Sequence, residues 1–245
     1  MPSAASPSLF ANRLLERLPA RQRAAMLASC EPVELAQGQV IAEPGNAIAD
    51  IYFPTGSAIC LLAPMEGGQV VEVVLVGNEG FYGVPVALGV GHSGLRAVVQ
   101  GAGSAWRMDA GAFRRHLADV PRASLFENVN LYIHVLMAQL GRSAGCNRFH
   151  SVEERVARWL LMIGDRTEAA TFPMTQERLA YTLGVRRVGV TQAAGALQKR
   201  RLIAYARGMV TILDSGGLEG AACSCYRADL RLYEKSLPEA IKRRP

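Results

Sequence analysis

The sequence contains no hydrophobic run that approaches the roughly 18 apolar residues needed for a membrane-spanning helix. Its start, residues 1–9, lacks the basic segment and apolar core of a secretory signal. The few cysteines are odd in number, scattered and without a C-x-x-C motif, which does not indicate a disulfide framework. They are Cys30, Cys60, Cys146, Cys223 and Cys225. We therefore expect a soluble cytoplasmic protein of one or two domains that does not bind membranes and whose thiols are unengaged.

A motif of one common enzyme class is also missing. The sequence has no phosphate-binding P-loop of the form G-x-x-x-x-G-K-[ST]. The histidines form no H-x-H pair, although metal-dependent barrel enzymes need clustered ligands. They are His92, His116, His134 and His150, and we expect each to be exposed or hydrogen-bonded. The prediction is a protein that is not an enzyme and has no metal or cofactor site, although the sequence alone leaves haem open.

The charge that is present lies at one end of the chain. Residues 1–150 hold 11 Lys and Arg against 11 Asp and Glu, so the whole net charge of +6 lies in residues 151–245. Residues 175–210 contain seven basic side chains and a single acidic one, Glu177. A neutral body with a basic end is typical of a protein that contacts a polyanion, although a solvated cationic face gives the same composition.

The first part of the chain has the pattern of short strands. Residues 12–29 predict two short helices separated at Pro19. Short apolar runs then alternate with Gly, Pro and Asn, as strands alternate with turns. The expected strands are 33–35, 40–41, 51–53, 58–62, 70–76, 97–99 and 105–108. Short strands at this spacing predict an antiparallel β-sandwich or barrel, which could be structural or could hold a ligand.

Helices follow the strands. A short helix is predicted at 109–117 and a longer one from about 122 to 142, with an apolar stripe along one face. The stripe consists of Leu125, Val129, Tyr132, Leu136 and Leu140. Its periodicity fits packing on its own domain and pairing with a second copy equally well.

Another helix is predicted at 151–165, where Ser151 and Glu154 match a capping box. Its buried side is expected to include Val156, Leu160 and Ile163. We expect Gly164 to end this helix, residues 166–173 to form a loop, and the boundary between domains to lie near 145–151.

Residues 175–197 carry the most specific pattern. Thr175 is a good N-cap, and Gly184 can take the left-handed conformation that ends a helix and turns the chain sharply. Apolar faces lie on either side of it: Leu179, Ala180 and Leu183, then Val190, Ala193, Ala194 and Leu197. Two short helices joined by a glycine turn predict a helix-turn-helix. The plainer alternative is a helical hairpin with arginines on its surface.

The second of these helices has side chains suited to reading DNA, because a helix fits the major groove with its first residues at base edges. Arg187 could pair with guanine and Gln192 with adenine. Arg186 is expected nearer the buried side, with a phosphate or turn role. Thr175 and Gln176 open the preceding helix, whose amide end suits a phosphate. The other DNA-binding candidates are Val188, Thr191, Lys199 and Arg207.

A β-hairpin is predicted directly after these helices. The apolar runs 202–205 and 209–213 flank Arg207-Gly208, which suits a tight turn. A helix-turn-helix followed by a hairpin is the winged form, in which Arg207 at the tip would contact backbone phosphate.

In this order of parts, and over nearly its whole length, the chain resembles the Crp/Fnr family of bacterial transcription regulators. The most specific matches are SVEERVARWLL at 151–161, TQExLAxxLG at 175–184 and LxxxxLI at 197–203. The glycines of the β region, with Gly80-Phe-Tyr-Gly83, are similar to the family's cyclic-nucleotide-binding fold. The resemblance implies an α+β fold with three parts: a sensory β-sandwich or barrel at 1–121, a long dimerisation helix at 122–147 and a winged helix-turn-helix domain at 148–245.

Members of this family are typically homodimers that bind paired half-sites in promoter DNA. The resemblance therefore implies a homodimer, a palindromic site in double-stranded DNA, and RNA polymerase as a further partner. It also favours the dimerisation interpretation of the stripe from Leu125 to Leu140.

Two departures from the family pattern matter. Cyclic-nucleotide binders of the family use a Gly-Glu and an Arg-Ser/Thr, whereas here Val84 follows Gly83, and Arg96 is the cation nearest to Ser93. A buried phosphate without its cation is costly, so we do not expect dependence on cAMP. The alternative is another small ligand, such as a cyclic dinucleotide, at these four residues. In the reading helix, many members have Glu and a second Arg where this chain has Val188 and Gln192. The target site is therefore expected to differ from the common family site.

Overall fold

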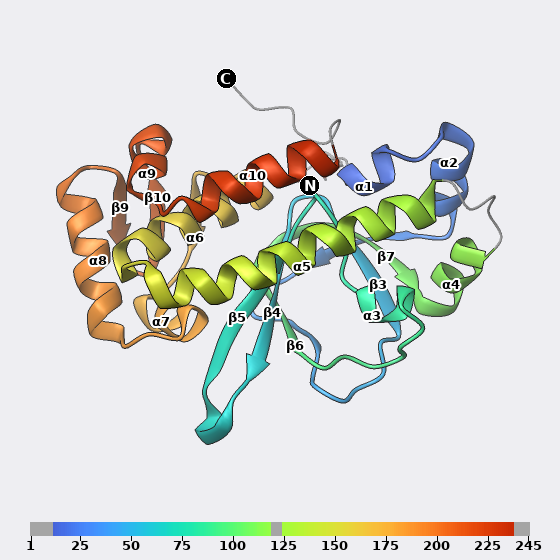
Figure 1. Cartoon of the computed structure of the whole chain (residues 1–245), viewed down its shortest axis with the longest axis horizontal. Coiled ribbons are helices and arrows are strands. Elements are labelled where there is room, and N and C mark those ends of the chain that lie inside the picture. Colours follow the sequence, from blue (N-terminus) through green and yellow to red (C-terminus); the bar gives the residue numbers. More distant parts are fainter. Residues whose placement is uncertain (1–11, 119–123, 238–245) are drawn as a thin grey trace, which may run out of the picture.

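The structure, a computed structural model, describes residues 12–118 and 124–237. A β domain lies at one end of the molecule and a largely helical domain at the other, and one long helix, α5 (Leu125–Phe149), runs along both (Figure 1). The predicted α+β architecture, a sandwich followed by a long helix and a winged helix-turn-helix, is confirmed. No helix in the described ranges is long and apolar enough to cross a membrane.

Two short helices, α1 (Arg13–Glu16) and α2 (Ala20–Ala28), precede the strands and are separated at Pro19, as predicted. The first begins at Asn12, whose side-chain oxygen accepts a hydrogen bond from the Leu15 amide. The side-chain amide of Asn12 donates to the carbonyls of Pro54 and Gly80, at 2.9 and 2.8 Å. This buried side chain therefore ties the first helix to the β domain.

The β domain is a sandwich of two antiparallel sheets, with strand orders β1-β7-β3 and β2-β6-β4-β5. Its strands are β1 (Glu31–Leu35), β2 (Val40–Ala42), β3 (Asp50–Pro54), β4 (Ala58–Pro64), β5 (Val70–Val76), β6 (Arg96–Gly101) and β7 (Gly103–Asp109). All seven predicted strands are present. Shorter elements are the 3₁₀ turn η1 (Glu66–Gly68), α3 (Val84–Ala87) and α4 (Ala110–Ala118). Rings of Phe53, Phe81 and Phe113 meet in the core, with centroids 5.4 to 6.1 Å apart.

The long helix α5 extends beyond its predicted end. Its predicted first residue, 122, lies outside the described residues, and its last residue is Phe149 rather than 142. Gly141 and Gly145 lie within α5 and do not end it. A glycine weakens a helix by only about 1 kcal/mol and still donates its backbone hydrogen bond. Chain direction changes at His150 and Ser151, before the next helix begins.

The helix α6 (Val152–Thr167) starts with the predicted capping box, since Ser151 accepts from the Glu154 amide and Glu154 accepts from the Ser151 amide. The expected buried residues, Val156, Leu160 and Ile163, are indeed buried. The prediction that Gly164 ends the helix is wrong. Helix α6 continues to Thr167, and a Cβ on Gly164 would lie 3.1 Å from Ile212 Cδ1. This glycine therefore allows close packing on the wing.

The rest of the helical domain contains the winged helix-turn-helix and two terminal helices. Its elements are β8 (Thr171–Pro173), α7 (Gln176–Leu183), α8 (Arg187–Lys199), β9 (Ile203–Ala206), β10 (Met209–Ile212), α9 (Ser215–Ala221) and α10 (Cys225–Ser236). The three strands form a sheet in the order β8-β10-β9. The expected loop at 166–173 is thus partly wrong, because its end pairs with β10. Helix α10 lies along α5 (Figure 1), where Asp229 accepts from Arg142 at 2.6 Å.

Two apolar cores hold the chain together. One fills the sandwich and includes residues of α5, and the other joins the outer face of the β4–β5 pair to the helical domain. Neighbouring residues of β4 face different cores, with Ile59 in the first and Cys60 in the second, as alternation along a strand requires. Leu75 of β5 and Leu160 of α6 also belong to the second core. The two domains therefore share apolar packing.

Candidate nucleic-acid interface

The turn between α7 and α8 has the geometry of a helix-turn-helix. The hydroxyl of Thr175 caps α7 by accepting from the Arg178 amide at 3.1 Å. Gly184 ends that helix in the left-handed conformation, with φ +62° and ψ +39°. The Val185 amide then donates to the Ala180 carbonyl at 3.0 Å, which closes the turn before α8 begins. The predicted bend at Gly184 is confirmed.

One side of α8 is fixed in the core. Its buried residues are Val190, Ala193, Ala194 and Leu197, as the spacing predicted. They pack against α6, α7 and β9, so the axis of α8 is set by three neighbouring elements. A rigidly held helix can present its other side in a defined orientation.

The opposite side of α8 is open. Arg187, Gln192 and Lys199 are exposed, and within the described residues their side chains make no hydrogen bond or ion pair. Val188 is 66% exposed although it is apolar. These residues lie on the outer face, as predicted. Arg186 is also exposed, contrary to the expectation of a position nearer the buried side. It is the N-cap with ψ 140°, so the helical rotation of 100° per residue does not apply to it.

Two of the candidate residues hold the two helices to each other. The hydroxyl of Thr191 donates to Gln176 Oε1 at 2.7 Å and lies 3.1 Å from the Arg187 carbonyl oxygen. This contact joins the first turn of α7 to the middle of α8. Thr191 and Gln176 thus add a polar contact between the two helices.

Helix α7, the first helix of the helix-turn-helix, packs on the β domain. Arg178 donates to the Val99 carbonyl of β6 at 3.1 Å, and its partial burial lowers the pKa of its guanidinium. Gln100 donates to the Thr182 hydroxyl at 2.9 Å, and Gln37 donates to the Pro173 carbonyl at 2.7 Å. Arg178 therefore contributes to the basic composition of this end but faces the sandwich. The open face of α8 is not covered by these contacts.

The tip of the wing lies next to the start of α7. Arg207 and Gly208 have φ values of +52° and +76°, which fits the tight hairpin turn that was predicted. The Met174 amide donates to the Gly208 carbonyl at 2.7 Å, and a Cβ on Gly208 would lie 3.5 Å from Thr175 Cγ2. Exposed Arg207 therefore lies at the same end of the domain as the N-terminus of α7.

The candidate ligand residues of the β domain are already engaged with the protein. Arg96 donates to Glu43 at 3.1 Å, so the nearest cation is paired with a carboxylate. Ser93 is buried and donates to the Leu95 carbonyl at 2.6 Å. Gly83 precedes Val84, the first residue of α3, and has φ +117°; a Cβ there would lie 2.3 Å from Ile51 Cδ1. The structure therefore offers no unpaired cation at these positions.

Four of the five stripe residues on α5 face the β domain of their own chain. Leu125, Val129, Tyr132 and Leu136 are buried in the sandwich core, whereas Leu140 is 41% exposed. As the chain stands, only Leu140 among the predicted dimerisation residues is accessible to a second copy. Periodicity alone did not distinguish the two roles, because both need the same spacing.

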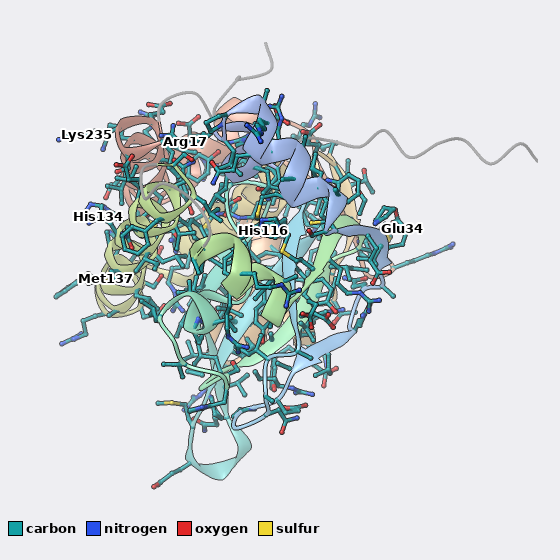
Figure 2. All side chains as sticks on the ribbon, turned by 90° about the vertical axis from the view of Figure 1, so that its right-hand side faces the viewer. Arg17, Glu34, His116, His134, Met137 and Lys235 are labelled. Atoms are coloured by element: carbon teal, nitrogen blue, oxygen red, sulfur yellow. The ribbon has the colours of Figure 1, made fainter. Side chains whose placement is uncertain are left out.

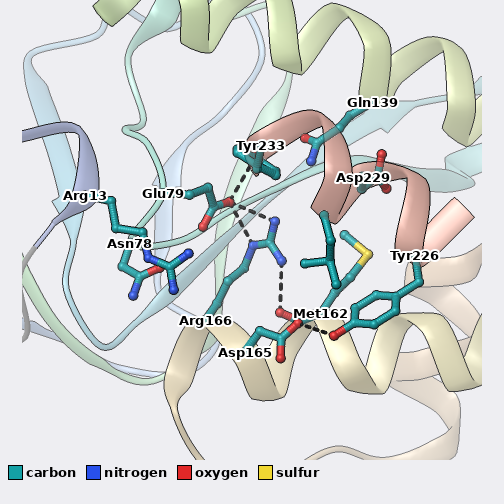
Figure 3. Close-up of a pocket in the computed structure, with 11 residues that line it drawn as sticks. Arg13, Asn78, Glu79, Gln139, Met162, Asp165, Arg166, Tyr226, Asp229 and Tyr233 are labelled. Carbon is teal, nitrogen blue, oxygen red and sulfur yellow. Dashed lines mark hydrogen bonds and ion pairs between the residues drawn. The ribbon is translucent and has the colours of Figure 1, made fainter. Parts of the chain in front are cut away.

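A buried ion pair lies where the domains meet (Figure 3). Arg166 of α6 donates to Glu79 Oε1 through Nε at 2.9 Å and forms an ion pair through its terminal nitrogen at 2.8 Å. The hydroxyl of Tyr233 lies 3.5 Å from the same oxygen. Burial alone would lower the pKa of Arg166, but the Glu79 carboxylate outweighs it and the net direction is upward. Sequence analysis did not anticipate this pair, because 87 positions separate its members.

The structure also brings together side chains that were expected to be unengaged. Cys146, His150, Cys223 and Cys225 can each offer a ligand atom, and these atoms all lie within 4.8 Å of one another. The available signals were the spacing of four residues between Cys146 and His150 and the pair Cys223-x-Cys225. Neither is a recognised metal motif alone, and 77 positions separate Cys146 from Cys223.

Comparisons with known proteins agree with this geometry. Residues 154–221 match the family model of the Crp-like helix-turn-helix domain. No curated protein matches the chain by sequence. Among solved structures, the chain resembles the c-di-GMP responsive global regulator CLP of Xanthomonas campestris, with a TM-score of 0.62 and 14% identity over 79% of this chain and 99% of that one. The chain also resembles FixK2 of Bradyrhizobium japonicum, with a TM-score of 0.62 and 11% identity over 80% of this chain and 98% of that one. For a CRP/FNR-family transcriptional regulator of Thermus thermophilus, the TM-score is 0.58 and the identity 20%, over 78% of this chain and 98% of that one.

Proposed function

We propose that this chain, which is of the Crp/Fnr type in its fold and in its helix-turn-helix domain, is a homodimeric transcription regulator that binds specific sites in double-stranded DNA. The observation that carries the proposal is the open face of α8, where Arg187, Val188 and Gln192 are exposed and engaged with no other side chain of residues 12–118 and 124–237. Unpaired polar side chains on a rigidly held helix are what base-edge recognition requires.

These side chains divide into two roles. Arg187 can form two parallel hydrogen bonds with guanine, Gln192 can do so with adenine, and Val188 can contact a thymine methyl group. Cations around them bind phosphate and position the helix without reading sequence. We assign that role to Arg186, Lys199 and Arg207, together with the N-terminus of α7 at Thr175 and Gln176.

A second copy would pack on the outer side of α5. Phe126, Met137 and Leu140 are 51%, 66% and 41% exposed, and Ile133 between them is half-buried. Figure 2 shows Met137 and His134 on the outer edge of this helix. The intervals of 7, 4 and 3 residues place the four apolar side chains on one face, as a pair of helices needs. Dimerisation through this face would place two copies of α8 against two half-sites.

The regulator is proposed to work without cAMP. A phosphate at the β domain would have to displace Glu43 from Arg96, and no carboxylate follows Gly83 to hold a ribose hydroxyl. The CLP protein is described as c-di-GMP responsive, so a cyclic dinucleotide is the ligand to include beside cAMP when the effector is sought. RNA polymerase is the proposed partner at promoters in the cytoplasm.

Selection of genomic fragments by the purified full-length chain tests this function. We expect enrichment of a palindrome whose half-site centres lie about 34–36 Å apart, with affinity that falls steeply between two salt concentrations. The selection is repeated with cAMP, with cyclic di-GMP and without a nucleotide. Recovery of fragments with no shared sequence, or a site recovered only with cAMP, would contradict the proposal.

A further inference from the structure

The end of α5 and the junction between α9 and α10 meet at four side chains with metal-binding atoms. The Sγ atoms of Cys146 and Cys223 are 3.5 Å apart, and Cys225 Sγ lies 3.6 Å from His150 Nδ1. The ligand atoms of all four residues lie within 4.8 Å of one another. The three cysteines are buried, with 2 to 6% of their surface exposed, and His150 is half-buried.

These distances fit one tetrahedral ion. With Zn–S near 2.3 Å and Zn–N near 2.0–2.1 Å, neighbouring ligand atoms of a tetrahedral site are about 3.5–3.8 Å apart. The S–S separation of 3.5 Å and the S–N separation of 3.6 Å are therefore close to the edges of such a tetrahedron. An iron–sulfur cluster binds its thiolates to different iron atoms, which requires a wider separation than a single ion does.

Local structure explains why these residues converge. Cys146 lies in the last turn of α5 and His150 is its C-cap, and the His150 amide donates to the Cys146 carbonyl at 3.2 Å, which holds the two residues together at this end of the helix. Cys223 and Cys225 flank Ser224, the N-cap of α10. The pair at the end of α5 thus faces the pair at the start of α10, although the two pairs come from distant parts of the chain.

The surroundings would balance the charge of a loaded site. Zn²⁺ with three thiolates carries a net charge of −1, and Arg155 and Arg158 of α6 line the same cavity as Cys146. Arg158 donates to Asp229 through a terminal nitrogen at 2.8 Å, but its Nε atom is buried and has no hydrogen-bond partner among the described residues. A buried unpaired donor beside a cluster of sulfur atoms suits a thiolate-rich site.

We propose that Cys146, His150, Cys223 and Cys225 bind one Zn²⁺ ion that fastens the start of α10 to the end of α5. Four protein ligands leave no position for water or substrate, so the site is structural rather than catalytic. Binding releases the protons of the three thiols to solvent. The four ligands lie outside residues 154–221, the part of the chain that matches the Crp-like domain. This inference does not depend on DNA binding.

Metal analysis of the full-length chain is the first test. The protein is purified without chelator, and its metal content is measured by mass spectrometry. We expect about one zinc per chain, and after replacement by Co²⁺ we expect the intense visible absorption of a tetrahedral site with thiolate ligands. A chain that is metal-free after purification and binds neither ion, that contains an iron–sulfur cluster, or that has a Cys146–Cys223 disulfide in place of metal would overturn the proposal.

Variants assign the ligands. His150→Ala should lower zinc affinity at least tenfold, whereas His150→Cys should retain zinc and shift the Co²⁺ spectrum towards that of four thiolates. Cys223→Ser should lose the zinc, and Cys30→Ser is the matched control because Cys30 lies elsewhere in the fold. If the Cys223→Ser variant fails to fold, the zinc affinity and the Co²⁺ spectrum of the two His150 variants test the ligand assignment. Unchanged zinc affinity and an unchanged spectrum in both would contradict the assignment.

Discussion

The indole N–H of Trp159 in α6 points at the carboxylate of Glu72 in β5, at 3.1 and 3.2 Å from its two oxygens. The thiol of Cys60 donates to the same carboxylate at 2.9 Å. One acidic side chain of the β domain is therefore held between a strand of its own sheet and a helix of the neighbouring domain. Loss of solvent raises the pKa of Glu72, and the two hydrogen bonds only partly offset that effect.

Glu72 should make the stability of the chain depend on pH. Since the pKa of Glu72 is raised in the folded chain, the folded state holds this proton more tightly than the unfolded state does. Its contribution to stability is complete below the unfolded pKa of about 4.3 and is lost as pH rises through the folded value. We expect Glu72→Gln to reduce the fall in unfolding free energy over that range, measured by urea titration at several pH values. Exposed Glu34→Gln is the control, and a Glu72→Gln profile parallel to that of the unmodified chain would contradict the prediction.

The buried ion pair at the domain junction gives a second prediction. Arg166→Met would leave the Glu79 carboxylate buried without its partner, which typically costs about 3–5 kcal/mol of unfolding free energy. Adding Glu79→Leu should recover most of that loss, because the unpaired charge is removed as well. The matched control is Arg227→Met, whose ion pair with Glu219 is exposed and should contribute about 0–1 kcal/mol. Equal losses for the two arginines, measured by urea unfolding, would count against this account.

Two arginines of the helix-turn-helix domain should respond differently to removal. Arg187→Ala should reduce discrimination at one base pair by about 1–3 kcal/mol. Arg207→Ala should weaken binding about equally on all sequences and lower the salt dependence by about one counterion. Binding is measured on the selected site and on single-base variants of it at several salt concentrations. If Arg187→Ala gave the same loss on every sequence, Arg187 would be a phosphate contact instead.

The outer face of α5 predicts the effect of a new charge on assembly. Met137→Glu should weaken the dimer at least tenfold, or by about 1.4 kcal/mol, because the carboxylate would be buried between two helices. Leu88→Glu is the control, since Leu88 is 61% exposed and lies at the end of α3 rather than on α5. Sedimentation at several concentrations measures both variants. Equal dissociation constants for the two would rule out this face as the dimer contact.

The elements of the fold followed from local patterns more reliably than their ends did. Short apolar runs bounded by Gly, Pro and Asn predicted all seven strands of the sandwich, and the rotation of 100° per residue predicted both sides of α8. Glycine misled at Gly164, because the same residue can end a helix or permit close packing, and only the neighbour Ile212 distinguishes the two. The terminal helices α9 and α10 were not anticipated.

The candidate site could be predicted only where it is local. The exposed face of α8 is formed by residues of one 13-residue helix, so its spacing is visible in the sequence. Burial of the α5 stripe depends on a sandwich formed by distant residues, and the exposure of Arg186 depends on where the helix begins. The grouping of Cys146 with Cys223 requires α10 to return along α5, which no local pattern encodes.

The core shared by β4, β5 and α6 has a mechanical consequence. Swinging the helical domain away from the sandwich would transfer side chains such as Leu62, Leu75 and Leu160 from packed surroundings to water, at about 1.5–3 kcal/mol for each one fully uncovered. Within the described residues, the β domain and the helical domain of one chain are therefore expected to move together as one rigid body. In the proposed homodimer, a signal that changed DNA binding would therefore tilt one subunit against the other, with each subunit turning as a unit.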